Sequence, residues 1–394
     1  MKSNSKTLGD IIKAVDERNS DEKTKEVLGI SINKEFMPSV ANIIGTDLSK
    51  YKLLRKSRFA FNSMHTGRDE RLPIALFKRD DIAIVSPAYF MFEIKNKDEV
   101  DEDYLMIWFQ RPEFDHTCWY MTDASVRGGL SWDDFCRISI ELPSIEEQRK
   151  IVHDYKVITN RIELLKKINE QISTLSKTIY NHWFVDFSHF KNCDMIESKN
   201  CRIPKGWKLG RLKDIMTYAG GQQPPSEEFV FEPQDGYIRL VQIRDYETDK
   251  YATYIPIDSK NKLCEEHDIM IARYGASLGR ICFGLSGAYN VALAKVFPNK
   301  HYYREYLRCF LNTDNFYNGI NGSGERSAQQ GFNQEGMDSF LIPIPPDDVF
   351  KDFEKIMSPL FEYQLSIRKS LIDLYKIEQM IVAIMAKGGD DNAI

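Results

Sequence analysis

The second half of this 394-residue chain repeats the first half at an offset of about 202 residues. Short identities recur in the same order along both halves. The matched positions are Leu8, Asp10 and Ile11 with Leu212, Asp214 and Ile215; Ala88 and Tyr89 with Ala288 and Tyr289; Tyr104 and Leu105 with Tyr306 and Leu307; Phe114 with Phe316; Gly129 with Gly331; and Pro143 with Pro345. This offset far exceeds the roughly 20–50-residue periods of solenoids. The sequence therefore predicts two similar domains rather than an array of small units.

A long helix is predicted after the last matched proline of each half. Ser144 and Glu147 have the spacing of a capping box, which opens a helix. Apolar residues then recur at every seventh position in both copies, and this pattern is typical of long helices that pack together. The two rows are Ile151, Ile158, Leu165, Ile172 and Ile179 in the first copy, and Phe353, Leu360, Ile367, Leu374 and Ile381 in the second. Pro359 lies inside the second pattern, where it predicts a kink or a helix start.

The segment before each helix has a different texture. About 140 residues of short apolar runs are interrupted by Gly, Pro, Asn and Asp, as in domains with small sheets. We predict an α+β fold with two pseudo-symmetric globular domains joined by two long antiparallel coiled-coil helices. The expected boundaries are 1–143 for the first domain, 144–190 for the first helix, 191–206 for a linker, 207–345 for the second domain, 346–387 for the second helix and 388–394 for a tail.

The distribution of charge leaves two interpretations open. The net charge of −5 does not favour nucleic acid, because a DNA-binding surface must supply Lys and Arg to displace counterions. Residues 50–79, however, carry nine basic side chains against only Asp69 and Glu70. The nine are Lys50, Lys52, Arg55, Lys56, Arg58, Arg68, Arg71, Lys78 and Arg79. This basic patch fits a DNA-facing surface or a solvated basic face.

Composition excludes several other classes. The seven cysteines are odd in number and form no CxxC pair, which argues against a disulfide framework and a structural zinc site. No apolar stretch fits a signal peptide or the roughly 20 residues of a membrane span. We therefore expect a soluble, cytoplasmic protein without a membrane segment or a metal site.

A direct search for catalytic motifs yields one candidate set. The sequence has no GxxxxGK[ST] phosphate loop, and no GxGxxG follows a predicted strand. Asp81 with Glu93 and Lys95 has the carboxylate and ExK pattern with which many nucleases hold Mg²⁺, but it equally fits a solvated strand end. We predict that the chain has no catalytic residues and binds no cofactor.

The repeat itself suggests a way of binding DNA. Two similar domains joined by antiparallel helices acquire an approximate two-fold axis, and DNA half-sites are related in the same way. Because the two domains differ in sequence, they would read unlike half-sites with an unread gap between them. The same pseudo-symmetry would give two similar docking surfaces, so one copy of this chain could recruit two copies of a catalytic partner.

Five tracts of the sequence resemble specificity subunits of type I restriction-modification systems. They are RGGLSWDDFCRISIELP (127–143), LPSIEEQRKIVHDYKVITNRIELLKKINEQI (142–172), IPKGW (203–207), ARYGASLGRICFGLSGAYNVALAKVFP (272–298) and GSGERSAQQGFNQEGMDSFLIPIPP (322–346). The resemblance covers nearly the whole chain in the right order. It implies a target-recognition domain in each half, a helical spacer, and assembly with two methyltransferase subunits and with restriction subunits. The resemblance assigns S-adenosylmethionine, ATP and Mg²⁺ to those partners.

Polar loops are the candidates for contact with double-stranded DNA. Base edges are read mainly by Arg, Lys, Asn and Gln, whereas hydroxyl groups often hold phosphate. In the first half the candidates are Asn62, His65, Arg68, Arg71, Ser125 and Arg127. In the second half they are Arg239, Arg244, Arg273, Tyr274, Ser277, Arg280, Arg326, Gln329 and Gln330.

Overall fold

The computed structural model describes residues 5–41, 43–64, 66–122, 129–198, 201–249, 251–322, 336–337 and 340–385. The chain divides into two compact units. The first unit combines Met1–Glu163 with Asp373–Ile394, and the second is Leu164–Ile372. Each unit is a globular domain together with part of each long helix, so the division runs through the helices instead of around them.

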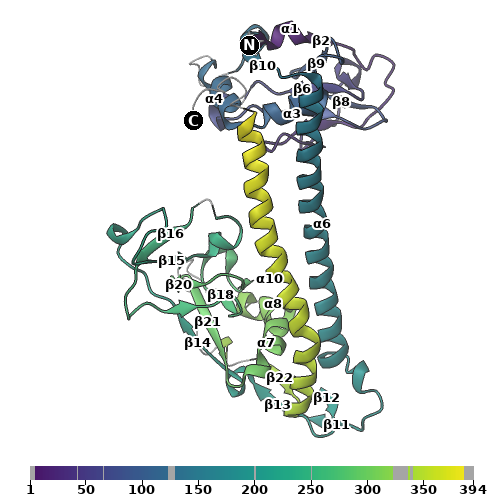
Figure 1. Cartoon of the computed structure of the whole chain (residues 1–394). Coiled ribbons are helices and arrows are strands. Elements are labelled where there is room, and N and C mark those ends of the chain that lie inside the picture. Colours follow the sequence, from purple (N-terminus) through teal and green to yellow (C-terminus); the bar gives the residue numbers. More distant parts are fainter. Residues whose placement is uncertain are drawn as a thin grey trace. The chain divides into compact units, whose positions relative to one another are not determined.

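The first unit is built on a four-stranded antiparallel sheet with the strand order β2-β9-β6-β7 (Figure 1). The same unit contains three further two-stranded sheets, β3-β4, β5-β8 and β1-β10. The strands are β1 (Ser5–Thr7), β2 (Ile12–Ala14), β3 (Leu28–Ile30), β4 (Phe36–Pro38), β5 (Lys52–Leu54), β6 (Arg58–Phe61), β7 (Ile74–Phe77), β8 (Ala83–Val85), β9 (Phe90–Ile94) and β10 (Ser139–Glu141). The helices are α1 (Leu8–Ile11), the short 3-10 turn η1 (Leu48–Lys50), α2 (Thr66–Asp69), α3 (Glu102–Phe109), α4 (Pro112–Tyr120) and α5 (Trp132–Arg137).

Aromatic residues form the core of the first unit. Phe59 of β6 stacks on Phe92 of β9 with 4.8 Å between ring centroids, and both rings meet Phe109 of α3 edge-on. Phe135 of α5 closes the same cluster. The central sheet is thus covered on one face by α3, α4 and α5, and Leu72 of the connection between β6 and β7 is also buried in this core.

The second unit contains an equivalent four-stranded antiparallel sheet with the order β14-β21-β18-β19 (Figure 1). Its second sheet is four-stranded, β16-β15-β20-β17, and includes one parallel pair. The strands are β11 (Met195–Ser198), β12 (Cys201–Pro204), β13 (Lys208–Arg211), β14 (Met216–Gly220), β15 (Tyr237–Val241), β16 (Thr253–Pro256), β17 (Leu263–Cys264), β18 (Met270–Ala272), β19 (Ile281–Cys282), β20 (Gly287–Tyr289), β21 (Leu293–Pro298) and β22 (Leu341–Ile344). The helices are α7 (Arg304–Leu311) and α8 (Asp314–Gly322), with 3-10 turns η2 (Ser188–Phe190), η3 (Leu212–Asp214), η4 (Ser226–Glu228), η5 (Ile243–Tyr246), η6 (Gly275–Ser277) and η7 (His301–Tyr303).

The sequence repeat is a repeat of structure. Helices α7 and α8 follow α3 and α4 at an offset of 202 residues, and β13-β22 pairs as β1-β10 does. Strands β14, β21, β18 and β19 take the places of β2, β9, β6 and β7. The halves diverge in their second sheets, where two separate ribbons in the first unit correspond to one mixed sheet in the second. The common framework therefore carries different additions in the two halves.

Both long helices are present. Helix α6 is Ile145–Phe184 and α10 is Asp347–Ile384. The predicted capping box forms, since the Ser144 hydroxyl accepts from the Glu147 amide at 3.3 Å and the Glu147 carboxylate accepts from the Ser144 amide at 3.0 Å. Pro359 lies inside α10 and does not start it. Helix α6 ends before the expected boundary at 190, and the expected linker 191–206 contains the β11-β12 hairpin.

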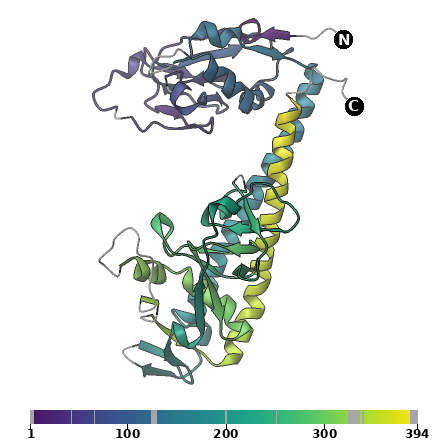
Figure 2. The ribbon, with the colours of Figure 1, turned by 90° about the vertical axis from the view of Figure 1, so that its left-hand side faces the viewer.

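Within each unit the segments of the two long helices run antiparallel, as predicted (Figures 1 and 2). In the second unit Asn169 of α6 faces Gln364 of α10, with 3.0 Å between the amide oxygen and Nε2, while Tyr180 faces Phe353. In the first unit the Tyr155 hydroxyl donates to Glu378 at 3.1 Å. All ten residues of the two predicted apolar rows are buried or half-buried.

A buried charge ties the second domain to its helix. Arg308 of α7 is fully buried, pairs with Glu305 at 3.0 Å, and lies between the rings of Phe283 and Phe361, with its guanidinium carbon 4.6 and 4.7 Å from the ring centroids. Phe361 belongs to α10. This cation–π contact on both faces offsets part of the cost of burying the guanidinium.

None of the helices in the described part of the chain is long and apolar enough to cross a membrane.

Candidate nucleic-acid interface

The candidate loops of the two halves occupy equivalent places in the fold. Residues 62–73 connect β6 to β7, and residues 273–280 connect β18 to β19. These strand pairs form the same edge of the two equivalent sheets. These loops are candidates because of their polar composition. In the structure, both connect the same pair of equivalent strands, once in each half.

The first of these hairpin connections is held by its own backbone and by Asn62. The amide of Asn62 donates to the Pro73 carbonyl at 2.9 Å, and its side-chain oxygen accepts from the Met64 amide at 3.1 Å. The Asn62 side chain is thus partly committed to the loop. Arg71 is exposed. His65 and the side chain of Arg68 lie outside the described residues.

A buried ion pair contacts the end of this hairpin connection. Lys34 and Asp115 lie 2.8 Å apart, with side chains only 5% and 9% exposed, and the same carboxylate oxygen accepts from the Leu72 amide at 3.1 Å. Lys34 also donates to the Phe109 carbonyl. Burial lowers the pKa of Lys34, while Asp115 opposes that shift. The end of the candidate loop is therefore fixed to α4 through Asp115.

The second candidate connection adopts a tight turn. Gly275 and Gly279 have φ angles of +67° and +82°, a region that favours glycine. Arg273 packs its guanidinium over Tyr274, 5.1 Å from the ring centroid, and donates to the Val291 carbonyl at 3.3 Å. A Cβ at Gly220 of β14 would lie 2.4 Å from Arg273 Nη1, so glycine leaves the room for this side chain.

In both halves a described residue that lies near a second candidate segment in the chain contacts the hairpin connection. In the first half the Leu130 amide donates to the Ser63 carbonyl at 3.4 Å, just after the candidates Ser125 and Arg127 in the chain. In the second half Asn321, at the end of α8, donates to the Leu278 carbonyl at 3.2 Å. The candidates Ser125, Arg127, Arg326, Gln329 and Gln330 themselves lie outside the described residues.

Three candidate arginines of the second half lie around one acidic segment. Arg239 of β15 pairs with Asp249 at 2.7 Å, and Arg280 pairs with Glu247 at 2.6 Å. Arg244 of η5 donates weakly to Thr253 Oγ1 at 3.4 Å and has its side chain 51% exposed. Three candidate arginines from separate segments therefore lie around residues 245–249.

Most of the basic patch at 50–79 is paired in the folded chain. Seven of its nine basic side chains form ion pairs with carboxylates of the same unit, and most of those carboxylates are remote in sequence. The pairs are Lys50 with Asp47, Lys52 with Asp16, Arg55 with Glu17, Lys56 with Asp80, Arg58 with Glu17 and Glu93, Lys78 with Asp103, and Arg79 with Glu26 and Asp81. This patch is not a broad cationic surface, and the candidates that remain in it lie in the hairpin connection.

The suspected nuclease set is accounted for by other contacts. Asp81 pairs with Arg79 at 2.8 Å, Glu93 pairs with Arg58 at 2.8 Å, and Lys95 donates to the Gly9 carbonyl at 2.6 Å. The described residues contain no group of three or more His, Cys, Asp or Glu side chains arranged to hold a metal ion.

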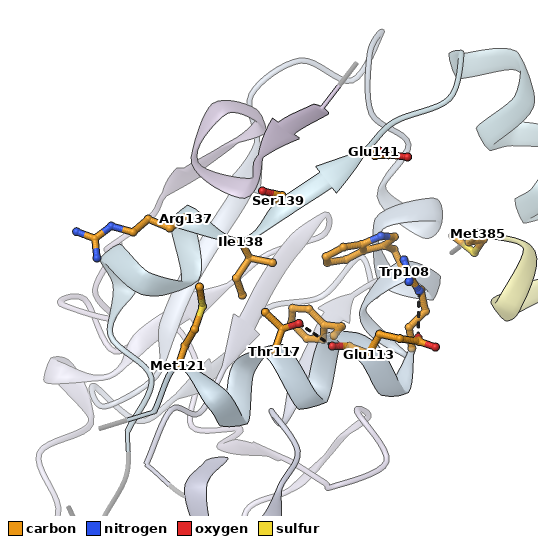
Figure 3. A pocket seen from close by; sticks show the side chains of 11 residues that line it. Trp108, Glu113, Thr117, Met121, Arg137, Ile138, Ser139, Glu141 and Met385 are labelled. Atoms are coloured by element: carbon orange, nitrogen blue, oxygen red, sulfur yellow. Dashed lines mark hydrogen bonds and ion pairs between the residues drawn. The ribbon is translucent and has the colours of Figure 1, made fainter. Parts of the chain in front are cut away.

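A cavity of about 420 Å³ lies in the first unit (Figure 3). Trp108, Phe114 and Met385 supply its apolar wall, and Arg111 pairs with Glu113 at its rim, 3.4 Å apart. Among the described residues, no candidate DNA-binding residue lines this cavity.

Sequence reasoning missed two groups of residues that contact the candidate loops or arginines. One is the supporting pair Lys34 and Asp115, whose separation in sequence gives no local signal. The other is the acidic segment Asp245, Glu247 and Asp249, whose alternating carboxylates directly after Arg244 were visible in the sequence.

Comparison with known proteins now bears on both halves. The family model described as "Type I restriction modification DNA specificity domain" matches residues 3–174 and again 204–375. The chain is 26% identical over 308 residues to the MjaIX specificity subunit of Methanocaldococcus jannaschii, covering 74% of this chain and 70% of that one. It is 23% identical over 232 residues to the HindI specificity subunit of Haemophilus influenzae, covering 56% and 48%. The crystal structure of an S subunit from M. genitalium has the same fold, with a TM-score of 0.62 at 15% identity over 98% of this chain and 96% of that one.

Proposed function

The chain belongs to the type I restriction-modification DNA specificity family, and from this premise we propose that each half reads one part of a bipartite double-stranded DNA target. As a specificity subunit, the chain is the DNA-recognition component of a restriction-modification complex. The observation that carries the proposal is the pair of equivalent hairpin connections, 62–73 and 273–280, which are contacted by Leu130 and Asn321, respectively.

The two parts of the target should differ. The shared sheets hold the hairpin connections in the same place, but the loops differ in sequence and length, and the second sheets differ in topology. Side chains that differ at equivalent positions read different bases. The target is therefore asymmetric, and the segment of DNA between its two parts is unread, with a length that depends on α6 and α10.

The proposed contacts combine base and phosphate recognition. Arg71 comes from the first connection, Arg273 and Arg280 come from the second, and Arg244 contributes from η5. Guanidinium groups bind guanine O6 and N7 or phosphate oxygens in a bidentate manner. Tyr274 packs under Arg273 and restricts its freedom, so this arginine loses less conformational entropy when it binds.

We assign no catalysis and no cofactor to this chain. Two partner methyltransferase subunits would carry out methyl transfer with S-adenosylmethionine, and partner restriction subunits would carry out the ATP- and Mg²⁺-dependent restriction. We place the complex in the cytoplasm. Exposed apolar residues on α10 support a docking role for this helix. Ile377, Met380 and Ile384 are 42–61% exposed in the first unit, at the spacing of one helical face. The internal repeat supports two partner copies.

The test is to co-express the chain with its cognate methyltransferase subunit and to map methylated bases across a genome. We expect one motif with two unlike parts separated by a fixed gap. Replacing residues 1–143 by the equivalent domain of a relative should change one part and spare the other. A continuous motif, or methylation that survives deletion of this chain, would contradict the proposal.

A further inference from the structure

The acidic segment 245–249 of the second unit forms ion pairs with two of the candidate DNA-binding arginines and lies beside a third. Arg239 comes from β15, Arg244 from η5 and Arg280 from the connection between β18 and β19. Glu247 forms an ion pair with Arg280 at 2.6 Å, and Asp249 forms one with Arg239 at 2.7 Å. Asp245 lies between Arg239 and Arg244, at 3.8 and 3.9 Å.

The three carboxylates differ in burial, and this assigns them different roles. Asp245 is fully buried and accepts from the Gln242 amide at 2.9 Å, so it fixes the turn η5. Glu247 and Asp249 are 66% and 40% exposed. Their pairs are formed at the surface, where an ion pair contributes only about 0–1 kcal/mol. A well-placed phosphate or guanine edge can therefore displace them.

The buried end of Arg239 shows that its position is set by the fold as well as by Asp249. Its side chain is only 18% exposed, and its Nε atom is buried without a hydrogen-bond partner among the described residues. Arg368 of α10 donates to the carbonyls of Asp245 and Tyr246 at 3.1 and 3.2 Å and holds the turn in place from below. The acidic segment is thus anchored while the outer carboxylates remain accessible.

We propose that Glu247 and Asp249 withhold Arg280 and Arg239 from the phosphates of non-target DNA and release them only on the correct target. This inference rests on the proposed function. Non-target binding depends almost entirely on neutralised phosphates, each of which adds about 0.9 to the slope of log affinity against log salt. While the ion pairs persist, the two arginines add nothing to that slope. On the target, base edges and correctly positioned phosphates replace the carboxylates as partners of the arginines.

The test compares Glu247→Gln with Glu232→Gln in the full chain assembled with its methyltransferase partner. Both substitutions remove one exposed carboxylate of the same unit, so they change the net charge equally. The probes are one duplex with the mapped target and one of equal length without it. Affinities are measured from 50 to 300 mM salt.

For Glu247→Gln we expect the non-target salt slope to steepen by about one and the non-target affinity to rise roughly fourfold at 0.2 M salt. The target slope should not change, and Glu232→Gln should behave as the parent. In an Arg280→Gln background, Glu247→Gln should have no further effect. Asp249→Asn should act likewise through Arg239.

The inference is overturned if Glu247→Gln matches Glu232→Gln, or if its effect persists without Arg280. Failure of the proposed function gives a different result, because the parent complex would then show no preference for the target duplex. A parent that prefers its target, with an unchanged Glu247→Gln salt slope, rejects the inference alone.

Discussion

Lengthening both long helices by one heptad should widen the unread gap without changing either part of the target. The insertion sites are between Glu163 and Leu164 in α6 and between Ile372 and Asp373 in α10, where the chain divides into its two units. These sites avoid Arg368 and Lys369, which contact the second domain through Tyr246 and Glu266. Whole heptads keep the apolar rows on the packing face, so the fold should be retained.

The size of the effect follows from helix geometry. Seven residues add about 10 Å at a rise of 1.5 Å per residue. This length corresponds to about 3 base pairs at 3.4 Å each. Three base pairs also rotate one half-site by roughly 100°, since the duplex has 10–10.5 base pairs per turn. The gap should lengthen by about three base pairs, and affinity should fall because the DNA must twist to present both parts.

The assay is selection of bound duplexes from a library in which the two parts are fixed and the gap varies. A four-residue insertion in α6 alone is the control, because it turns the apolar row away from α10 and should destabilise the chain. If the seven-residue variant selects the original gap at full affinity, the helices do not set the gap.

Three further outcomes test the site and its support. Lys34→Met should lower the free energy of unfolding, measured in urea, by roughly 3–5 kcal/mol, because Asp115 stays buried without its cation. Adding Asp115→Asn should restore much of this stability. An unchanged urea midpoint for the single variant would show that the pair contributes nothing. Hydrogen bonds from Arg55 help to lower the pKa of Glu17 from 4.5 to about 2. The ionised carboxylate therefore stabilises the fold above pH 4.5, and this contribution is lost as the pH falls toward 2. The urea midpoints of Glu17→Gln and the parent should converge over that interval, and a difference independent of pH would refute the assignment. Arg71→Gln should weaken DNA binding and reduce the salt slope by about one if Arg71 contacts phosphate, whereas an unchanged slope would locate the contact elsewhere.

The sequence alone determined the framework of this protein. The 202-residue offset, the two apolar rows and the capping box at Ser144 were visible because each depends on neighbours close along the chain or on a regular period. The same local signals led to the two hairpin connections, since polar residues and glycines mark turns between strands. The β11-β12 pair was missed because each strand has only four residues, too few for a clear apolar alternation, although Ile203 of β12 is buried.

Only the tertiary structure decided which charges are available to DNA. The basic patch at 50–79 is mostly neutralised by carboxylates elsewhere in the unit, and the pair Arg58 and Glu93 joins residues 35 positions apart. In the same way, Arg280 meets Glu247 across 33 positions, and Lys34 meets Asp115 across 81. Such pairs depend on how strands and loops are brought together, which no local pattern records. Composition could therefore indicate candidate loops for DNA contact, whereas the electrostatic state of each arginine depends on the folded neighbours that surround it.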